Sequence, residues 1–159
     1  MAKIEGFRVK NFKSLKDVTL GQSWPDVTDE PLTPMTAVIG KNGVGKSALF
    51  DAFGFLADAL KSGVEEACDA HRRGGFEKLR TQGQTGPIEF EVYYRARTNV
   101  RPITYEIKIE TDEFGRPYVA SEIMQEGMEN SRPLFFLFSK DQTHPVSYTH
   151  LTLPTKRIV

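Results

Sequence analysis

Eight consecutive residues, GKNGVGKS at positions 40–47, constrain the fold of this chain more than any other feature. They match the pattern G-x-x-x-x-G-K-[S/T] at every fixed position. A short apolar run, MTAVI at 35–39, precedes them, and residues 47–61 follow with apolar side chains at helical spacing. We therefore predict an α/β fold in which a buried strand, a glycine-rich loop and an amphipathic helix follow one another.

The residue types of this loop are suited to holding phosphate groups. Gly43 and Gly45 let the backbone curl so that successive N–H groups point inward, and a helix starting near Lys46 adds the positive end of its dipole. Lys46 is the predicted catalytic residue because its ammonium group can reach the β- and γ-phosphates, and Ser47 is the predicted Mg²⁺ ligand. The competing interpretation is a glycine-rich turn that binds nothing. We predict that ATP is bound by all eight residues of the loop: Gly40, Lys41, Asn42, Gly43, Val44, Gly45, Lys46 and Ser47.

The remaining elements are expected to surround this unit as part of a P-loop NTPase domain. Residues 4–12 and 15–20 are rich in β-formers and predict an N-terminal hairpin, followed by a surface loop over 21–34. Residues 64–71 predict a weaker helix, and 71–87 a long loop. Period-two alternation over 88–94, 103–110 and 117–124, with a turn at 112–115, predicts an antiparallel meander.

Composition excludes few classes of partner. Lysine plus arginine equals aspartate plus glutamate at 21 each, so net charge gives no argument for or against nucleic acid. The single cysteine permits no internal disulfide, which suits a reducing compartment. The longest apolar run, residues 134–138, is too short to cross a bilayer, and the N-terminus lacks an apolar signal segment. We expect a cytoplasmic protein with no membrane partner.

The C-terminal segment differs in character from the rest. Residues 146–155 read VSYTHLTLPT, which resembles a transposon-type sequencing adapter translated in one reading frame. The alternative is a natural strand rich in threonine and leucine. We expect residues 1–145 to be the N-terminal part of an ATPase domain, and 146–159 to be a non-native tail that ends an interrupted reading frame.

Two stretches, IEGFRVKNFKSLKDVTL and AVIGKNGVGKSALFDAF, resemble the N-terminal lobe of ABC-type ATPases of the SMC, Rad50 and RecF kind. In those proteins a strand ending in N-F-K/R-S leads into a second strand, and the loop reads G-x-N-G-x-G-K-S. The short spacing between hairpin and loop resembles stand-alone predicted ATPases of the AAA-21 or overcoming-lysogenization type.

The resemblance implies that ATP is sandwiched between two subunits, hence an ATP-dependent homodimer, with DNA as a further partner. It also implies a later Walker B acid pair, a signature motif and a switch histidine, none of which occurs before position 145. Asp112 and Glu113 are interpreted as turn residues. By resemblance, Lys13 and Ser14 lie near the adenine or α-phosphate, or else form a solvated turn.

The family also has a glutamine that reaches Mg²⁺ and the attacking water. Gln82, Gln84 and Gln125 are the candidates, with Gln125 preferred, although each is also interpretable as an ordinary surface residue. The basic segment 72–80 contacts DNA phosphates or the nucleotide, or is a solvated loop.

The sequence thus favours ATP binding by this chain, with hydrolysis only in a full-length, SMC/RecF-like ATPase of DNA maintenance or of defence against mobile DNA. Two alternatives stay open: a non-hydrolysing nucleotide-binding module, and the ATP-binding subunit of a transporter.

Overall fold

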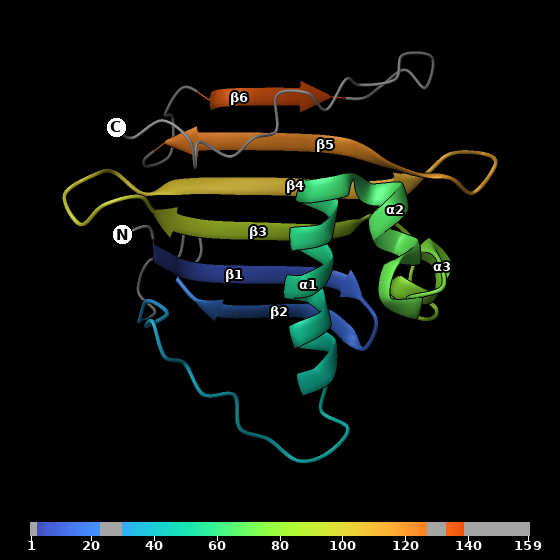
Figure 1. Ribbon diagram of the computed structural model, residues 1–159, viewed down its shortest axis with the longest axis horizontal. Helices are drawn as coiled ribbons and strands as arrows, with labels where there is room; N and C mark the ends of the chain where they lie inside the picture. The colour runs from blue at the N-terminus through green and yellow to red at the C-terminus, as the bar shows by residue number, and fades with distance from the viewer. Residues whose placement is uncertain (1–2, 23–29, 127–132, 139–159) are drawn as a thin grey trace.

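The computed structural model describes residues 3–22, 30–126 and 133–138. These residues form one antiparallel sheet of six strands in the order β2-β1-β3-β4-β5-β6 (Figure 1). The strands are β1 (Lys3–Phe12), β2 (Leu15–Gly21), β3 (Ile88–Arg95), β4 (Ile103–Thr111), β5 (Pro117–Glu126) and β6 (Pro133–Phe138). The predicted hairpin and the predicted meander are both confirmed, and β1 joins them by pairing with β3.

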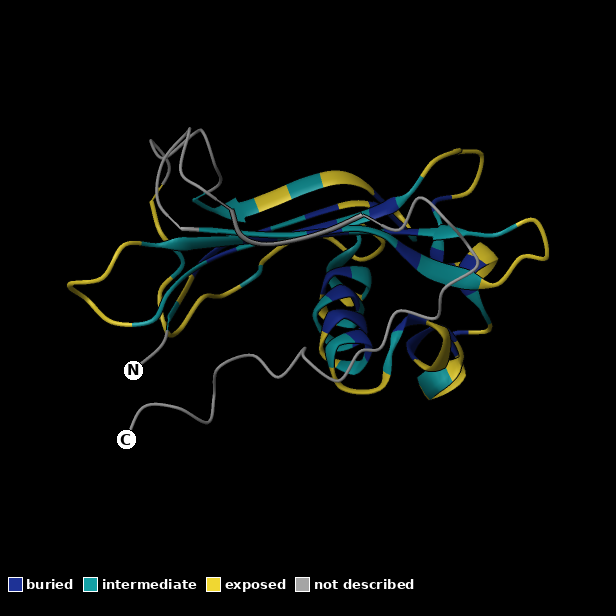
Figure 2. Ribbon diagram, turned by 90° about the horizontal axis from the view of Figure 1, so that it is seen from above, coloured by how far each residue is buried: buried dark blue, intermediate teal, exposed yellow. Residues whose placement is uncertain are grey.

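The helices all lie on one face of this sheet (Figure 2). Helix α1 (Lys46–Ser62) runs across the strands, and α2 (Val64–Asp69) and α3 (Phe76–Leu79) lie beside it, near the β1–β2 and β4–β5 turns (Figure 1). A single 3₁₀ turn, η1 (Ala70–Arg72), follows α2. The helix after the loop and the weaker helix after it are therefore confirmed, whereas α3 falls within a segment that was predicted to be a loop.

The core lies between α1 and the sheet and is rich in aromatic rings. Phe7 of β1 stacks on Phe53 of α1 with ring centroids 3.9 Å apart, and Phe90 of β3 stacks on Phe55 at 5.6 Å. Phe12 approaches both Phe55 and Phe90. Buried residues of α1 recur three and four positions apart, as at Ala52, Phe55 and Ala59, and those of β4 alternate, which is why the two sequence periods predicted these elements correctly.

The turn between β1 and β2 is held in place by the segment that leads into β3. Asn11 and Lys13 both have left-handed backbones, with φ of 61° and 50°. The Asn11 amide donates hydrogen bonds to the carbonyl oxygens of Gly86 and Pro87, and the Lys13 N–H donates to the Leu79 carbonyl at 2.6 Å. These bonds offset the cost of a backbone conformation that side chains with a Cβ disfavour.

The prediction of a buried strand over 35–39 is wrong for the described structure. Residues 30–45 contain no helix or strand, and Met35 and Ile39 are 91% and 93% exposed. In Figure 1 this segment extends beyond β2, away from the sheet. A strand must bond its backbone groups to neighbouring strands. Leu32 donates its N–H to the Glu5 carbonyl of β1, but residues 35–39 form no ladder with any of the six described strands. The apolar composition of residues 35–39 is typical of a strand, but composition does not show whether another strand is available to pair with it.

One further prediction can be compared with the structure. The turn at residues 112–115 is confirmed. Strand β6 was not predicted, because its uninterrupted apolar run shows no alternation. The proposed tail, residues 146–159, lies outside the described residues.

Candidate phosphate-binding site

The phosphate-binding loop leads directly into α1. Gly43 and Gly45 both adopt left-handed backbones, with φ of 86° and 96°. Gly45 is the N-cap residue, and its carbonyl accepts the first helical hydrogen bond from the Leu49 N–H at 2.9 Å. A side chain at either glycine would strain the turn, so the sequence pattern and the geometry agree here.

The N-terminus of α1 keeps its positive character. No side chain caps it, and no acidic residue occupies its first turn, in a helix that the structure describes throughout. The first N–H groups of an α-helix have no partner within the helix, and they carry the positive end of its dipole. This end of α1 is therefore suited to an anion.

Lys46 and Ser47 are the first two residues of the helix. The Lys46 ammonium group donates to the carbonyl oxygens of Gly40 and Lys41, the second at 2.7 Å. The lysine is thus folded back over its own loop, and Ser47 is exposed to solvent. A phosphate group bound at this point would compete with the two carbonyl groups for the ammonium group.

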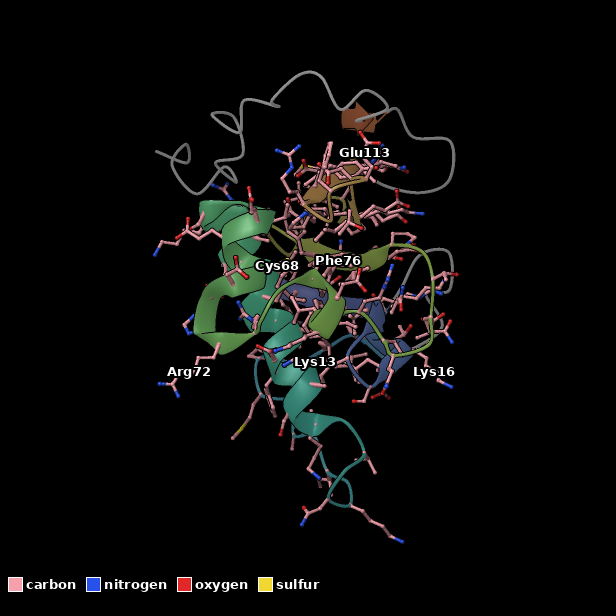
Figure 3. All side chains as sticks on the ribbon, turned by 90° about the vertical axis from the view of Figure 1, so that its right-hand side faces the viewer. Lys13, Lys16, Cys68, Arg72, Phe76 and Glu113 are labelled. Atoms are coloured by element: carbon pink, nitrogen blue, oxygen red, sulfur yellow. The ribbon has the colours of Figure 1, made fainter. Side chains whose placement is uncertain are left out.

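The β1–β2 turn packs directly against this loop. A Cβ atom placed on Gly45 would lie 3.2 Å from the Ser14 Oγ atom and 3.0 Å from a methyl group of Leu15. Ser14, expected near the nucleotide by resemblance, is therefore in contact range of the loop. Lys13 instead forms an ion pair with Asp51 of α1, with 2.5 Å between Nζ and Oδ2. Figure 3 shows Lys13 beside α1, whereas Lys16 and Arg72 extend away from the molecule.

The structure does not bring the glutamine candidates to this loop. Gln82 and Gln84 are exposed in the segment after α3. Gln125 lies on β5 and lines a small cavity with Thr104 and Glu106, which alternate along β4 with the buried core residues Tyr105 and Ile107.

Sequence reasoning missed an ionic cluster behind the loop. Arg73, interpreted as part of a solvated or DNA-binding loop, has a side chain that is only 4% exposed. Its guanidinium group bonds to Asp51 at 3.0 Å, to Asp58 at 2.6 Å and to the Ala67 carbonyl at 3.0 Å. The two aspartates are seven residues apart on α1, which places them on one helical face, and that spacing was the available signal.

The ion pairs of this cluster outweigh burial in setting the pKa values of Asp51 and Arg73. Burial alone would raise the pKa of Asp51, but its contacts with Lys13 and Arg73 outweigh burial, so the pKa lies below its ordinary value. Burial likewise disfavours the charged form of Arg73, and its bonds to Asp58 and Asp51 reverse that effect and raise its pKa. Asp51 and Arg73 are therefore both ionised near neutral pH.

The described residues hold no obvious Walker B carboxylate. The Asp112 carboxylate closes the β4–β5 turn by accepting hydrogen bonds from the backbone N–H groups of Phe114 and Arg116. Figure 3 shows Glu113 far from Lys13 and from α1. Within the described ranges, no three acidic, histidine or cysteine side chains cluster in a way that could hold a metal ion. None of the helices described is long and apolar enough to cross a bilayer.

A glycine loop with left-handed turns, an uncapped helix after it, and Lys46 and Ser47 at the start of that helix are features of a phosphate-binding loop. Residues 35–157 match the profile of the family described as "AAA domain, putative AbiEii toxin, Type IV TA system". The chain belongs to this family. The match supports a P-loop ATPase-type domain that binds nucleotide. The match begins just before the loop and includes most of the segment interpreted as adapter-derived, so that interpretation stays a prediction. No curated protein matches the chain significantly.

Proposed function

We propose that the chain binds ATP with Mg²⁺ at residues 40–47. The start of α1 is the observation that carries this proposal: a helix with unpaired N–H groups and no acidic first-turn residue follows two left-handed glycines. An anion is the ligand that such a helix end favours, and Lys46 adds a full positive charge beside it. A triphosphate satisfies both features better than a neutral ligand.

The residues present fit the Mg-nucleotide complex. Lys46 would bind the β- and γ-phosphates once it leaves the loop carbonyls, and the Ser47 hydroxyl would hold Mg²⁺. The metal ion would neutralise charge on the phosphate oxygens. The backbone N–H groups around Gly43 and Gly45 would orient the phosphates.

For the full-length protein we propose ATP hydrolysis by an SMC/RecF-like homodimer, in DNA maintenance or in defence against mobile DNA. The N-F-K-S hairpin supports this class over a transporter subunit. The toxin–antitoxin designation of the family supports a role in defence. A non-hydrolysing nucleotide-binding module is the second candidate, favoured by the use of Asp112 in a turn.

Nucleotide binding can be tested with a fluorescent ATP analogue and Mg²⁺ on the 159-residue chain. Lys46→Ala should lower affinity about 10- to 100-fold, because a charged donor to a phosphate is worth roughly 1.5–3 kcal/mol. Lys61→Ala is the matched control: it removes a lysine from the last turn of the same helix and should leave affinity unchanged. Equal binding by the wild type and Lys46→Ala would refute the proposal.

A phosphate-release assay on the same chain separates the hydrolase from the binding module. We expect negligible turnover, since the described residues include no recognisable Walker B carboxylate to position Mg²⁺ and water. A rate near ~1 per second, ordinary for such enzymes, would instead favour hydrolysis by this chain alone.

A further inference from the structure

Asp51 connects three segments that are distant in the sequence. Its Oδ2 atom pairs with Lys13 of the β1–β2 turn at 2.5 Å, and its Oδ1 atom accepts from the Arg73 Nε at 3.0 Å. Asp51 itself lies one helical turn after Ser47. The carboxylate therefore lies between the hairpin turn, the first turns of α1 and the loop after η1.

The pairing with Asp51 restrains a residue that is otherwise strained. Lys13 has a left-handed backbone, which a residue with a Cβ adopts only when its surroundings enforce it. Two contacts do so: the Lys13 N–H bonds to the Leu79 carbonyl, and the ammonium group pairs with Asp51. Only the second of these depends on a side chain of α1.

The position of Lys13 determines the position of Ser14. Phe12 pairs with Leu15, so the turn contains only these two residues. The Ser14 Oγ atom in turn lies beside Gly45, 3.2 Å from where a Cβ atom would be, at the point where the phosphate-binding loop leads into α1. We therefore expect a change at Lys13 to move the surface against which this loop is packed.

Arg73 restrains the Asp51 carboxylate from the other side. Its guanidinium group lies along α1 over Gly54, where a Cβ atom would be 3.3 Å from Nη2, and over the ring of Phe55. With three hydrogen bonds and almost no exposure, this group has little freedom to move. It therefore limits the positions that the Asp51 carboxylate can take.

We infer that Asp51 is a positioning residue for the nucleotide: by holding Lys13, it keeps Ser14 against the phosphate-binding loop and so maintains the loop in a conformation that accepts a triphosphate. Asp51 does not touch the nucleotide in this scheme, and its effect passes through Lys13 and Ser14. The inference rests on the proposed binding of ATP at residues 40–47.

Asp58 supplies a matched comparison within the same cluster. It also bonds to Arg73, at 2.6 Å, and its side chain is exposed to a similar extent, 29% against 23% for Asp51. It lies two helical turns further from the loop and makes no contact with Lys13 among its ion pairs. A purely structural role for the cluster predicts the same behaviour from both aspartates, whereas a positioning role predicts different behaviour.

The test compares Asp51→Asn with Asp58→Asn in the full chain, by the affinity for a fluorescent ATP analogue with Mg²⁺ and by thermal unfolding without nucleotide. We expect Asp51→Asn to weaken binding about tenfold, and Asp58→Asn to change it by less than about twofold, while both lower the unfolding midpoint. Equal affinities for the two variants, or an Asp51→Asn variant that binds as tightly as the wild type, would overturn the inference.

Lys13→Met keeps the test decisive if Asp51→Asn does not fold, because Lys13 is partly exposed and its removal leaves Arg73 to neutralise Asp51. It should reproduce the tenfold loss, and the double variant should be no weaker than either single variant. Unchanged affinity of Lys13→Met, or additive losses, would overturn the inference. Failure of the proposed function would look different, since the wild type would then bind no better than Lys46→Ala.

Discussion

Replacing Glu122 with glutamine should remove a pH-dependent loss of stability. Glu122 lies on the helix-facing side of β5, opposite Ile107, and is 0% exposed. The Tyr105 hydroxyl donates to its Oε1 atom at 2.6 Å, and its Oε2 atom has no hydrogen-bond partner. Burial raises the pKa of Glu122 above its ordinary value of 4.5, although the hydrogen bond from Tyr105 opposes that change.

The magnitude follows from the two protonation equilibria. Below pH 4.5 both the folded and the unfolded chain keep the Glu122 proton, and its contribution to stability is complete. As pH rises further, the unfolded chain loses the proton first, so stability falls by about 1.4 kcal/mol per pH unit until the folded pKa is passed. Glutamine cannot titrate. Its buried amide N–H groups add a cost of about 1–3 kcal/mol that does not depend on pH.

Urea unfolding of the wild type and Glu122→Gln from about pH 4.5 to about pH 7 measures this effect. Other titrating groups contribute equally to both proteins, so the difference in unfolding free energy isolates Glu122. That difference should shift in favour of glutamine by about 1.4 kcal/mol per pH unit and then level off. A difference that stays constant across the range would refute the reasoning.

Three further outcomes follow from the structure. Asn11→Ala should lower the free energy of unfolding by about 3 kcal/mol and Asn11→Gly by about 2 kcal/mol. Both variants lose the hydrogen bonds to the Gly86 and Pro87 carbonyl groups, but only alanine strains the left-handed backbone. Equal losses in urea unfolding would contradict this. Burial raises the pKa of Cys68 to about 12, so a thiol reagent at about pH 8 should label it only as the chain unfolds, and rapid labelling of the native protein would count against this. Gly6→Ala would place a Cβ atom 1.4 Å from the Gln22 carbonyl oxygen, so its circular dichroism spectrum should lack native signal.

The meander was predictable because burial on one face imposes period two. Strands β3, β4 and β5 begin and end within about two residues of the predicted ranges, since α1 covers one face and the other stays polar. Helix α1 was predictable for the corresponding reason. What the pattern could not supply is the order of strands in the sheet. The contact between β1 and β3 joins residues about 85 apart in sequence, and no local signal encodes that pairing.

In the candidate site, too, the features encoded locally were predictable and those set by distant residues were not. Phosphate binding by the loop was predictable from Gly43, Gly45 and Lys46, because the types and spacing of neighbouring residues are sufficient to indicate it. The burial of Arg73 was not, because it depends on Asp51 and Asp58 more than ten residues earlier. A basic segment rich in glycine reads as solvated when only its neighbours in sequence are considered.

The space over Gly54 has a consequence for how this protein can evolve. Glycine inside a helix costs about 1 kcal/mol relative to alanine, so selection retains it there only while the guanidinium group of Arg73 occupies the adjacent volume. A lineage that lost the arginine would gain stability by filling position 54. Restoring the arginine would then require its guanidinium group to lie a few tenths of an ångström further from position 54. Substitutions at these two positions should therefore be correlated among descendants, and their order of occurrence should be constrained.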